Sequence, residues 1–135
     1  MSEPSPVRVL LVEDSAVLAG RITELIGRLP RVDLIGTVDT EADALQQLAS
    51  PTPPDVLILD LHLRDGSGFG VLRSLRRAHA SRPKVVVLTS FDLPQYRREA
   101  ESLGVDAFLN KSRDYHRLPV LLRAYAAEGG AKNGH

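Results

Sequence analysis

The sequence predicts an α/β fold: a single domain with a doubly wound, five-stranded parallel sheet in the strand order 2-1-3-4-5 and with five helices. Apolar segments typical of buried strands alternate five times with segments of helical periodicity, which indicates right-handed βαβ units. Glycine, proline and helix-capping residues separate these segments. The length of 135 residues and the hydrophobic content of 43% are sufficient for one compact core.

The first strand and helix have clear boundaries. Residues 7–12 (VRVLLV) are almost continuously apolar, as expected of a strand that is buried on both faces. Ser15 is a favourable helix N-cap, and apolar residues then recur at helical spacing until Pro30 ends the pattern. The second strand is predicted at residues 32–38.

The second helix and the third strand follow the same scheme. Thr40 is placed to cap the second helix, and the proline-rich segment 51–54 (PTPP) ends it. Residues 55–59 (DVLIL) form the third apolar strand. Asp60 follows this strand directly, at its carboxyl end.

The third and fourth helices flank the fourth strand. The turn sequence RDGSG at 64–68 precedes the third helix. The fourth strand covers residues 84–88 (KVVVL) and is followed by Thr89. The fourth helix is expected at 93–103, because Gly104 is placed to end it.

The last two elements are a short strand and a longer helix. The fifth strand is predicted at residues 105–109 and the last helix at about 114–127. Pro119 is tolerated in a helix only in the first turn, where its missing N–H has no partner to lose. The last helix is therefore allowed to begin later than its apolar pattern indicates.

The composition sets the expected domain boundaries. We expect a disordered polar lead at residues 1–6, the domain at 7–127 and a flexible, glycine-rich tail at 128–135. The sequence does not begin with a basic segment followed by an apolar stretch, so no signal peptide is expected. The apolar runs are too short to cross a bilayer. These features predict a cytoplasmic protein that makes no membrane contact.

The charge balance argues against direct nucleic-acid binding. Lysine plus arginine and aspartate plus glutamate number 17 each, so no net charge attracts nucleic acid or an acidic membrane. The arginine-rich segment 73–82 has no interleaved aromatic residues for base stacking, and it is predicted to be the solvated face of the third helix. The sequence has no cysteine, which excludes disulfides and thiolate metal sites.

Polar residues follow the strands at the points where each one ends. Glu13 and Asp14 follow the first strand, Asp60 the third, Thr89 the fourth and Lys111 the fifth. Ligands of open parallel sheets bind at the carboxyl ends of the strands, at the switch point of strand order. Three carboxylates in one cleft repel one another unless one takes up a proton or a cation lies among them. Oxygen ligands suit Mg²⁺, so the sequence predicts a Mg²⁺ site.

The same residues are suited to phosphoryl transfer. Asp60 is a candidate nucleophile that would form an aspartyl phosphate. A divalent cation and Lys111 would neutralise the charge on the phosphoryl group, and Thr89 would donate its hydroxyl to a phosphoryl oxygen. Taken singly, each residue is most simply a loop, turn, strand or surface residue. Their shared position at the ends of consecutive strands favours a site.

Four segments together resemble a known family. These segments are VEDS at 12–15, LDLHLRDGSG at 59–68, VVLTS at 86–90 and DAFLNKS at 106–112. They resemble the receiver domain of bacterial two-component response regulators, in a form similar to the LuxR/NarL-type regulators. The resemblance covers residues 7–127 and implies a flavodoxin-like fold.

The resemblance implies a role for each matching residue. Asp60 would be the phospho-acceptor, and Mg²⁺ would be held by Glu13, Asp14, Asp60 and the backbone carbonyl of His62. Lys111 would pair with the phosphoryl group. The resemblance further implies that Thr89 is the switch hydroxyl and that Phe108 is the aromatic switch residue.

The implied function is that of a signalling module and not of an enzyme, with modest autophosphorylation and autodephosphorylation activity. A sensor histidine kinase would supply the phosphoryl group. Thr89 would then move toward it, and Phe108 would rotate inward. The surface of the fourth helix, the fifth strand and the last helix would change and bind an output domain or a downstream protein, or form a homodimer. The domain would be either stand-alone or the N-terminal part of a transcriptional regulator.

Two positions depart from the family pattern. Arg64 and Ser112 stand where the family often has proline, and Ser112 makes a cis peptide bond after Lys111 less favourable. Three alternatives remain at this level. One is a Mg²⁺-dependent phosphatase with an aspartyl nucleophile, although His62 occupies the place of its usual second aspartate. Another is a flavin- or nucleotide-binding domain, although carboxylates in place of phosphate-binding amides would repel an anion. The last is a degenerate receiver that acts only as a docking module.

Overall fold

The computed structural model describes residues 5–78 and 82–132, and these residues form the predicted five-stranded parallel sheet in the order β2-β1-β3-β4-β5. The strands are β1 (Val7–Val12), β2 (Val32–Val38), β3 (Val56–Leu59), β4 (Lys84–Thr89) and β5 (Ala107–Asn110). The helices are α1 (Ala16–Gly27), α2 (Glu41–Leu48), α3 (Gly68–Arg77), α4 (Pro94–Ser102) and α5 (Leu118–Lys132), with a short 3₁₀ helix, η1 (Tyr115–Arg117), before α5.

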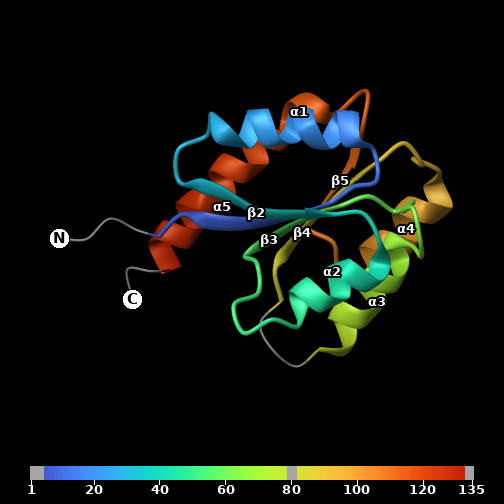
Figure 1. Ribbon diagram of the computed structural model, residues 1–135. Helices are drawn as coiled ribbons and strands as arrows, with labels where there is room; N and C mark the ends of the chain where they lie inside the picture. The colour runs from blue at the N-terminus through green and yellow to red at the C-terminus, as the bar shows by residue number, and fades with distance from the viewer. Residues whose placement is uncertain (1–4, 79–81, 133–135) are drawn as a thin grey trace.

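The helices cover both faces of the sheet, as the doubly wound prediction requires. Helices α1 and α5 lie on one face, and α2, α3 and α4 lie on the other (Figure 1). Alternate side chains of each strand therefore enter two separate cores: Val9 and Leu11 pack beneath α1 and α5, whereas Leu10 and Val12 pack toward α2 and α3. Burial on both faces explains why β1 reads as a continuous apolar run and not as an alternating one.

The predicted helix caps are present. The Ser15 hydroxyl accepts a hydrogen bond from the backbone N–H of Leu18 at 3.3 Å and thereby starts α1. The Thr40 hydroxyl accepts one from Asp43 at 3.1 Å at the start of α2. Each cap satisfies a backbone donor that has no partner within its helix. Both helices thus begin directly after a strand and leave the preceding loop short.

The fifth strand and the last helix differ from the prediction at their boundaries. β5 begins at Ala107, because the N–H of Val105 bonds to the carbonyl of Ala100 and so still belongs to the end of α4. Helix α5 begins at Leu118, which places Pro119 in its first turn as required.

The C-terminal boundary was predicted too early. Helix α5 runs to Lys132, so the segment 128–132 of the expected flexible tail is helical. Glycines weaken a helix but keep the N–H that the helical bonds require, so Gly129 and Gly130 do not end it as proline would. Residues 1–4 of the expected disordered lead and residues 133–135 of the tail lie outside the described residues.

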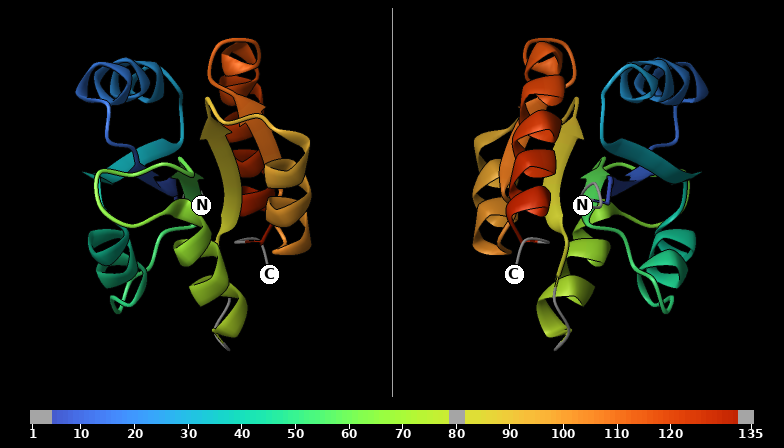
Figure 2. Two further views of the ribbon diagram at one scale, coloured as in Figure 1. Left: turned by 90° about the vertical axis from the view of Figure 1, so that its right-hand side faces the viewer. Right: turned by 90° about the vertical axis from the view of Figure 1, so that its left-hand side faces the viewer.

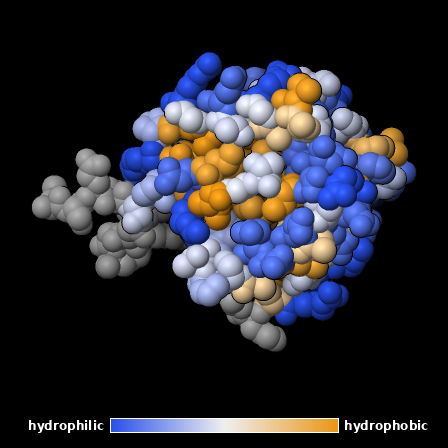
Figure 3. Space-filling model, in the orientation of Figure 1, coloured by the Kyte–Doolittle hydropathy of each residue, from blue (hydrophilic) through white to orange (hydrophobic). Residues whose placement is uncertain are grey.

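The surface follows the layered architecture. Figure 3 shows hydrophobic surface across the middle of one face, where the edge strand β2 lies between the two helix layers, and predominantly hydrophilic surface toward the carboxyl ends of the strands. Ile35 of β2 is 36% exposed. Within residues 5–78 and 82–132, the helices are all too short or too polar to span a membrane.

Candidate functional site

The strand ends bring the three predicted carboxylates together. One carboxylate oxygen from each of Glu13, Asp14 and Asp60 lies within 4.8 Å of the other two. The backbone holds two of these residues in place: the N–H of Glu13 donates to the carbonyl of Val38 at 2.9 Å, and that of Asp60 donates to Val12 at 3.0 Å. The edge of the sheet that carries this cluster faces the viewer in the left panel of Figure 2.

Two of the three carboxylates are almost completely buried. Glu13 and Asp60 are each 3% exposed, whereas Asp14 is exposed. A buried carboxylate is costly unless it is paired or takes up a proton. The cluster therefore needs positive charge nearby, and the next strand end along the sheet provides it.

Lys111 supplies that charge from the end of β5. Its Nζ donates to Asp60 Oδ2 at 2.8 Å and to Glu13 Oε2 at 3.1 Å. Burial acts to lower the pKa of this ammonium, but the hydrogen bonds and charges of Asp60 and Glu13 outweigh burial, so the Lys111 pKa lies above its usual value. Lys111 is thus held in its charged form between two carboxylates that come from different strands.

The surroundings of Glu13 raise the pKa of its carboxyl group. Burial, assisted by the charge of Asp60, raises the pKa of its carboxyl group. The N–H of Ser15, which donates to Glu13 Oε2 at 3.0 Å, and the Lys111 ammonium act in the opposite direction and only partly compensate. With all groups ionised, three carboxylates face one ammonium, so the cluster keeps an excess of negative charge.

The residues of the cluster fit a divalent cation. Mg²⁺ prefers oxygen ligands, and three carboxylate oxygens converge here with a negative charge that Lys111 alone does not cancel. His62 also lies at the cluster: its backbone N–H donates to Asp60 Oδ1 at 3.3 Å. The predicted role of the His62 carbonyl as a ligand stays a prediction.

Thr89 lies at the end of β4 with its side chain fully buried. Its hydroxyl accepts a hydrogen bond from the N–H of Phe91 at 3.2 Å, and its carbonyl accepts one from the N–H of Lys111 at 3.0 Å. The two residues that were predicted to contact a phosphoryl group, Thr89 and Lys111, are therefore joined directly through the backbone.

Phe108 is buried in this structure, and its predicted inward rotation on phosphorylation stays a prediction. The side chain is 5% exposed and packs with the core on the α3 and α4 side of the sheet. The guanidinium carbon of Arg97 lies 4.5 Å from the centre of the Phe108 ring and covers it. Burial of this ring therefore depends on the position of α4, from which Arg97 comes.

The loop after β4 carries residues that the sequence interpretation did not include. The rings of His62 and Phe91 stack with their centres 4.7 Å apart. Phe91 is 41% exposed and Leu93 46% exposed, whereas the side chain of Asp92 between them is only 12% exposed. The sequence FDL did not signal this arrangement, because an alternating pattern is expected to expose the acidic residue and to bury its apolar neighbours.

The two departures from the family pattern are accommodated locally. Arg64 forms two hydrogen bonds with the carboxylate of Asp39, at 2.9 and 3.2 Å. The N–H of Ser112 donates to the side chain of Asn110 at 2.9 Å. In the part of the chain that the structure describes, every peptide bond is trans, the one after Lys111 included, as expected for serine at that position.

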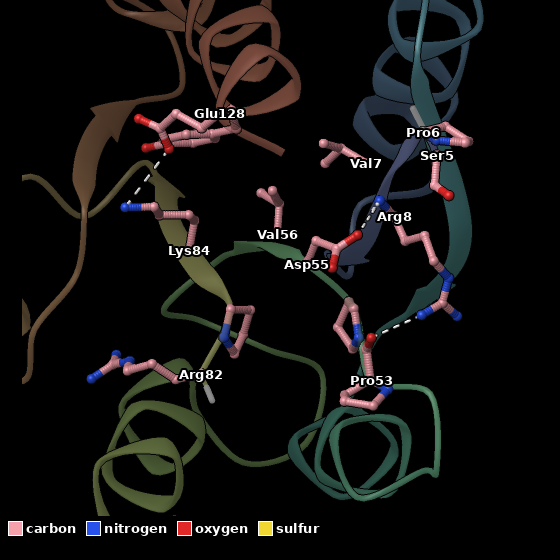
Figure 4. A pocket seen from close by; sticks show the side chains of 13 residues that line it. Ser5, Pro6, Val7, Arg8, Pro53, Asp55, Val56, Arg82, Lys84 and Glu128 are labelled. Carbon is pink, nitrogen blue, oxygen red and sulfur yellow. Dashed lines mark hydrogen bonds and ion pairs between the residues drawn. The ribbon is translucent and has the colours of Figure 1, made fainter. Parts of the chain in front are cut away.

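A pocket of about 450 Å³ opens at the opposite edge of the sheet, at the amino ends of β1, β3 and β4 (Figure 4). Its charged groups are already satisfied. The Arg8 guanidinium donates to the carbonyls of Thr52 and Pro53, and the Arg8 N–H donates to Asp55. Lys84 lies 3.9 Å from Glu128. The charged residues of this pocket are partly or fully exposed, whereas two carboxylates of the cluster are buried.

Comparison with known proteins gives a consistent result. Residues 9–123 match the family model of the response regulator receiver domain. The chain is 29% identical over 119 residues to the sensory transduction protein LytT of Bacillus cereus. The aligned segment covers 88% of this chain and 47% of LytT. The chain thus spans about half the length of the curated relatives that it matches first.

Solved structures also resemble the chain. A LuxR family DNA-binding response regulator from Staphylococcus aureus superposes with a TM-score of 0.79 at 26% identity, covering 89% of this chain and 98% of that one. The Mn²⁺-bound form of the response regulator Rcp1 superposes with a TM-score of 0.74 at 26% identity, covering 88% of this chain and 91% of the other.

Proposed function

The chain belongs to the family of response regulator receiver domains of two-component systems, and on this premise we propose that it accepts a phosphoryl group on Asp60 in a Mg²⁺-dependent reaction. The observation that carries the proposal is the bridge from Lys111 to both Asp60 and Glu13, at 2.8 and 3.1 Å. This bridge joins a buried nucleophile to a cation that can neutralise a phosphoryl group. A carboxylate with such a partner is suited to form an aspartyl phosphate.

The transfer step follows from these contacts. A carboxylate oxygen of Asp60 attacks the phosphorus of a phosphohistidine in a sensor histidine kinase. The new P–O bond forms as the P–N bond breaks, and the imidazole leaves with its electron pair and takes up a proton from solvent. Lys111 turns from Glu13 toward a phosphoryl oxygen and stabilises its charge. Glu13, Asp14 and Asp60 would hold Mg²⁺, which supplies charge neutralisation at the transferred group.

The response to phosphorylation rests on Thr89 and on the surface of α4, β5 and α5. Thr89 would turn its hydroxyl from Phe91 toward the phosphoryl group, and the segments attached to it would follow. Arg97 and Phe108, which are in contact between α4 and β5, lie in that surface. A partner that prefers one arrangement of the surface then responds to phosphorylation. The partner would be an output domain, a downstream protein or a second copy of the chain.

Similar proteins support the proposed Mg²⁺ dependence and the proposed output partner. Rcp1 was solved with Mn²⁺, a divalent cation that also takes oxygen ligands, and it has the same fold. A LuxR family relative is described as DNA-binding, which favours DNA-binding output in a longer protein of this type. The phosphatase alternative is less favoured, because the residue two positions after Asp60 is His62, whose ring stacks on Phe91.

The test is intact-mass measurement after incubation with acetyl phosphate, with and without Mg²⁺. We expect a single phosphoryl adduct on the wild type in Mg²⁺ and none on Asp60→Asn. Asp55→Asn is the matched control, because Asp55 lies beside the amino end of β3, the strand that Asp60 follows, and it should keep the adduct. An adduct that persists on Asp60→Asn would contradict the assignment, and no adduct on the wild type would favour the docking-module alternative.

A further inference from the structure

Asp92 lies where the loop after β4, the helix α4 and the loop after β5 meet. It belongs to the loop after β4, three residues beyond Thr89. Its Oδ1 accepts a hydrogen bond from Arg97 of α4 at 3.1 Å, and its Oδ2 pairs with Arg113 of the loop after β5. One carboxylate thus connects the segment that follows Thr89, the helix α4 and the segment that follows Lys111.

The loop around Asp92 is anchored by this side chain. Its neighbours Phe91 and Leu93 are 41% and 46% exposed, whereas the Asp92 side chain is 12% exposed. The loop therefore displays its apolar residues to solvent and directs its carboxylate inward. The side chains of its two partners, Arg97 and Arg113, are 38% and 70% exposed, so the restraint is that of two partly exposed ion pairs that share one carboxylate.

Thr89 is restrained by the same loop. Its hydroxyl accepts the N–H of Phe91 at 3.2 Å, so it faces the loop. For Thr89 to turn toward a phosphoryl group on Asp60, the bond from Phe91 has to open and residues 90–92 have to shift. Asp92 resists that shift as long as Arg97 and Arg113 hold it.

The contacts of Asp92 with Arg97 and Arg113, called the clamp below, also affect Phe108, the aromatic residue of β5. Arg97, which Asp92 orients, lies 4.5 Å above the centre of the Phe108 ring. Movement of Asp92 would release Arg97 from this ring and change the surface between α4 and β5. The path from Thr89 to that surface thus consists of contacts that the structure contains: Thr89 to Phe91, Asp92 to Arg97, and Arg97 to Phe108.

We propose that Asp92 is a positioning residue whose carboxylate, held by Arg97 and Arg113, stabilises the arrangement in which Thr89 faces the loop and opposes its turn toward Asp60. This inference rests on the proposed function and concerns how the turn of Thr89 toward Asp60 is regulated. Any change that weakens the clamp should favour the phosphoryl-bound arrangement, because removing a contact made in only one of two states shifts the population toward the other.

The experiment measures the affinity for beryllium fluoride in saturating Mg²⁺, where this complex mimics an aspartyl phosphate. We expect Asp92→Asn and Arg113→Gln each to bind it about two- to fivefold more tightly than the wild type, the range of one partly exposed ion pair. The affinity for Mg²⁺ alone should not change, because neither residue belongs to the carboxylate cluster. A merely structural role would lower the Tm without this selective gain.

The two substitutions separate a clamp from a simple charge effect. Asp92→Asn removes a negative charge and Arg113→Gln removes a positive one, so the electrostatic field alone would change anion affinity in opposite directions. The clamp predicts tighter binding in both, and less than additive gains in the double variant. Glu99→Gln is the matched control, since it removes an acidic charge from α4 that pairs with Arg73 and not with Asp92. This variant should bind like the wild type.

Opposite signs for the two variants, weaker binding in both, or no change would overturn the clamp. If a variant fails to fold, amide hydrogen exchange on the wild type decides: the Phe91 amide should lose protection when beryllium fluoride binds, and retained protection would contradict the inference. A wild type that binds no beryllium fluoride in Mg²⁺ would instead overturn the proposed function, and this inference with it.

Discussion

The two ends of the same strands are built in opposite ways. At the carboxyl ends of β1 and β3, Glu13 and Asp60 are 3% exposed, lie within reach of a third carboxylate and share a single ammonium. At the amino ends, the charged residues of the pocket in Figure 4 are more exposed; their side chains bond to backbone carbonyls, as Arg8 does, or lie near acids, as Lys84 does at 3.9 Å from Glu128. Both edges carry acids and bases, but among the described residues it is the carboxyl edge that brings buried like charges together.

This difference indicates which edge of the sheet is the candidate site of a reaction. Burial of like charges costs folding free energy, so a cluster of this kind is a candidate functional site on physical grounds. A pocket of about 450 Å³ lies at the amino edge and one of about 440 Å³ lies beside Glu13 and Asp14, so volume does not distinguish the two edges. Buried like charge is therefore a better guide here than pocket volume. Paired substitutions at the two edges test this comparison.

The largest difference is expected between two lysines, one at each edge. Lys111→Ala should slow phosphorylation by acetyl phosphate about 100-fold, the usual effect of removing one donor that stabilises developing charge. Lys84→Ala should leave the rate unchanged, because Lys84 lies at the opposite edge of the sheet, where it pairs with Asp106 and Glu128 at 3.9 Å each. The rate of adduct formation by intact mass provides the measurement. Equal rates for the two variants would remove Lys111 from the reaction.

The second difference concerns Mg²⁺ and the Tm. Binding to the folded state at ten times the dissociation constant contributes about 1.4 kcal/mol, which raises the Tm of a domain of this size by roughly 3–8 °C. Asp14→Ala should abolish this increase, because it removes an exposed ligand without disturbing a buried contact. Asp55→Ala at the amino edge should lower the Tm itself, since Asp55 accepts the Arg8 N–H, but should keep the Mg²⁺ response. Thermal unfolding with and without Mg²⁺ distinguishes the two, and a full Mg²⁺ response in Asp14→Ala would exclude that residue as a ligand.

The smallest expected effect is a gain in stability. Burial raises the pKa of Glu13, so the folded protein binds this proton more tightly than the unfolded chain does. Stability from this group is then greatest at low pH and declines as the pH rises from the usual value of 4.5 through the raised pKa. At neutral pH without Mg²⁺, Glu13→Gln should therefore raise the free energy of unfolding, by on the order of 1 kcal/mol or less.

Urea unfolding at several pH values checks this gain. The advantage of Glu13→Gln should vanish below pH 4.5, where the wild-type carboxyl group is also protonated. Glu128→Gln is the control at the amino edge: this residue is 54% exposed, and its loss should change stability by less than about 0.5 kcal/mol at any of these pH values. A Glu13→Gln variant that is less stable than the wild type at pH 7 would mean that the bonds from Ser15 and Lys111 outweigh the cost of burial.

The fold and most of the cluster were predictable from local patterns. Strands buried on both faces must be apolar along their whole length, so 7–12 and 55–59 stand out in the sequence. Ser15 and Thr40 cap helices through bonds that span only three residues, which sequence spacing alone specifies. Since parallel strands end at one edge of a sheet, the order of elements was enough to gather the carboxylates and Lys111 there.

The boundaries and the surroundings of the site depended on contacts between distant segments. The start of β5 at Ala107 depends on where the turn from α4 ends, and α5 continues to Lys132 although two glycines lie in its path. The burial of Phe108 in β5 depends on Arg97, which belongs to helix α4, and neither residue type indicates that contact.

The sequence predicted the strands, the N-caps of α1 and α2 and the acidic residues at the carboxyl edge, because these follow from periodicity, capping and chain direction. The strand order was assumed to be the common one for a fold of this type, and the sheet confirms it. Only the tertiary structure decided that Lys111 bridges Glu13 and Asp60, that His62 stacks on Phe91 and that Asp92 joins Arg97 to Arg113. Each of these contacts joins side chains from different segments of the structure, either two loops or a loop and a helix. Their distances depend on how the helices pack on the sheet, and no spacing along the chain encodes that packing directly.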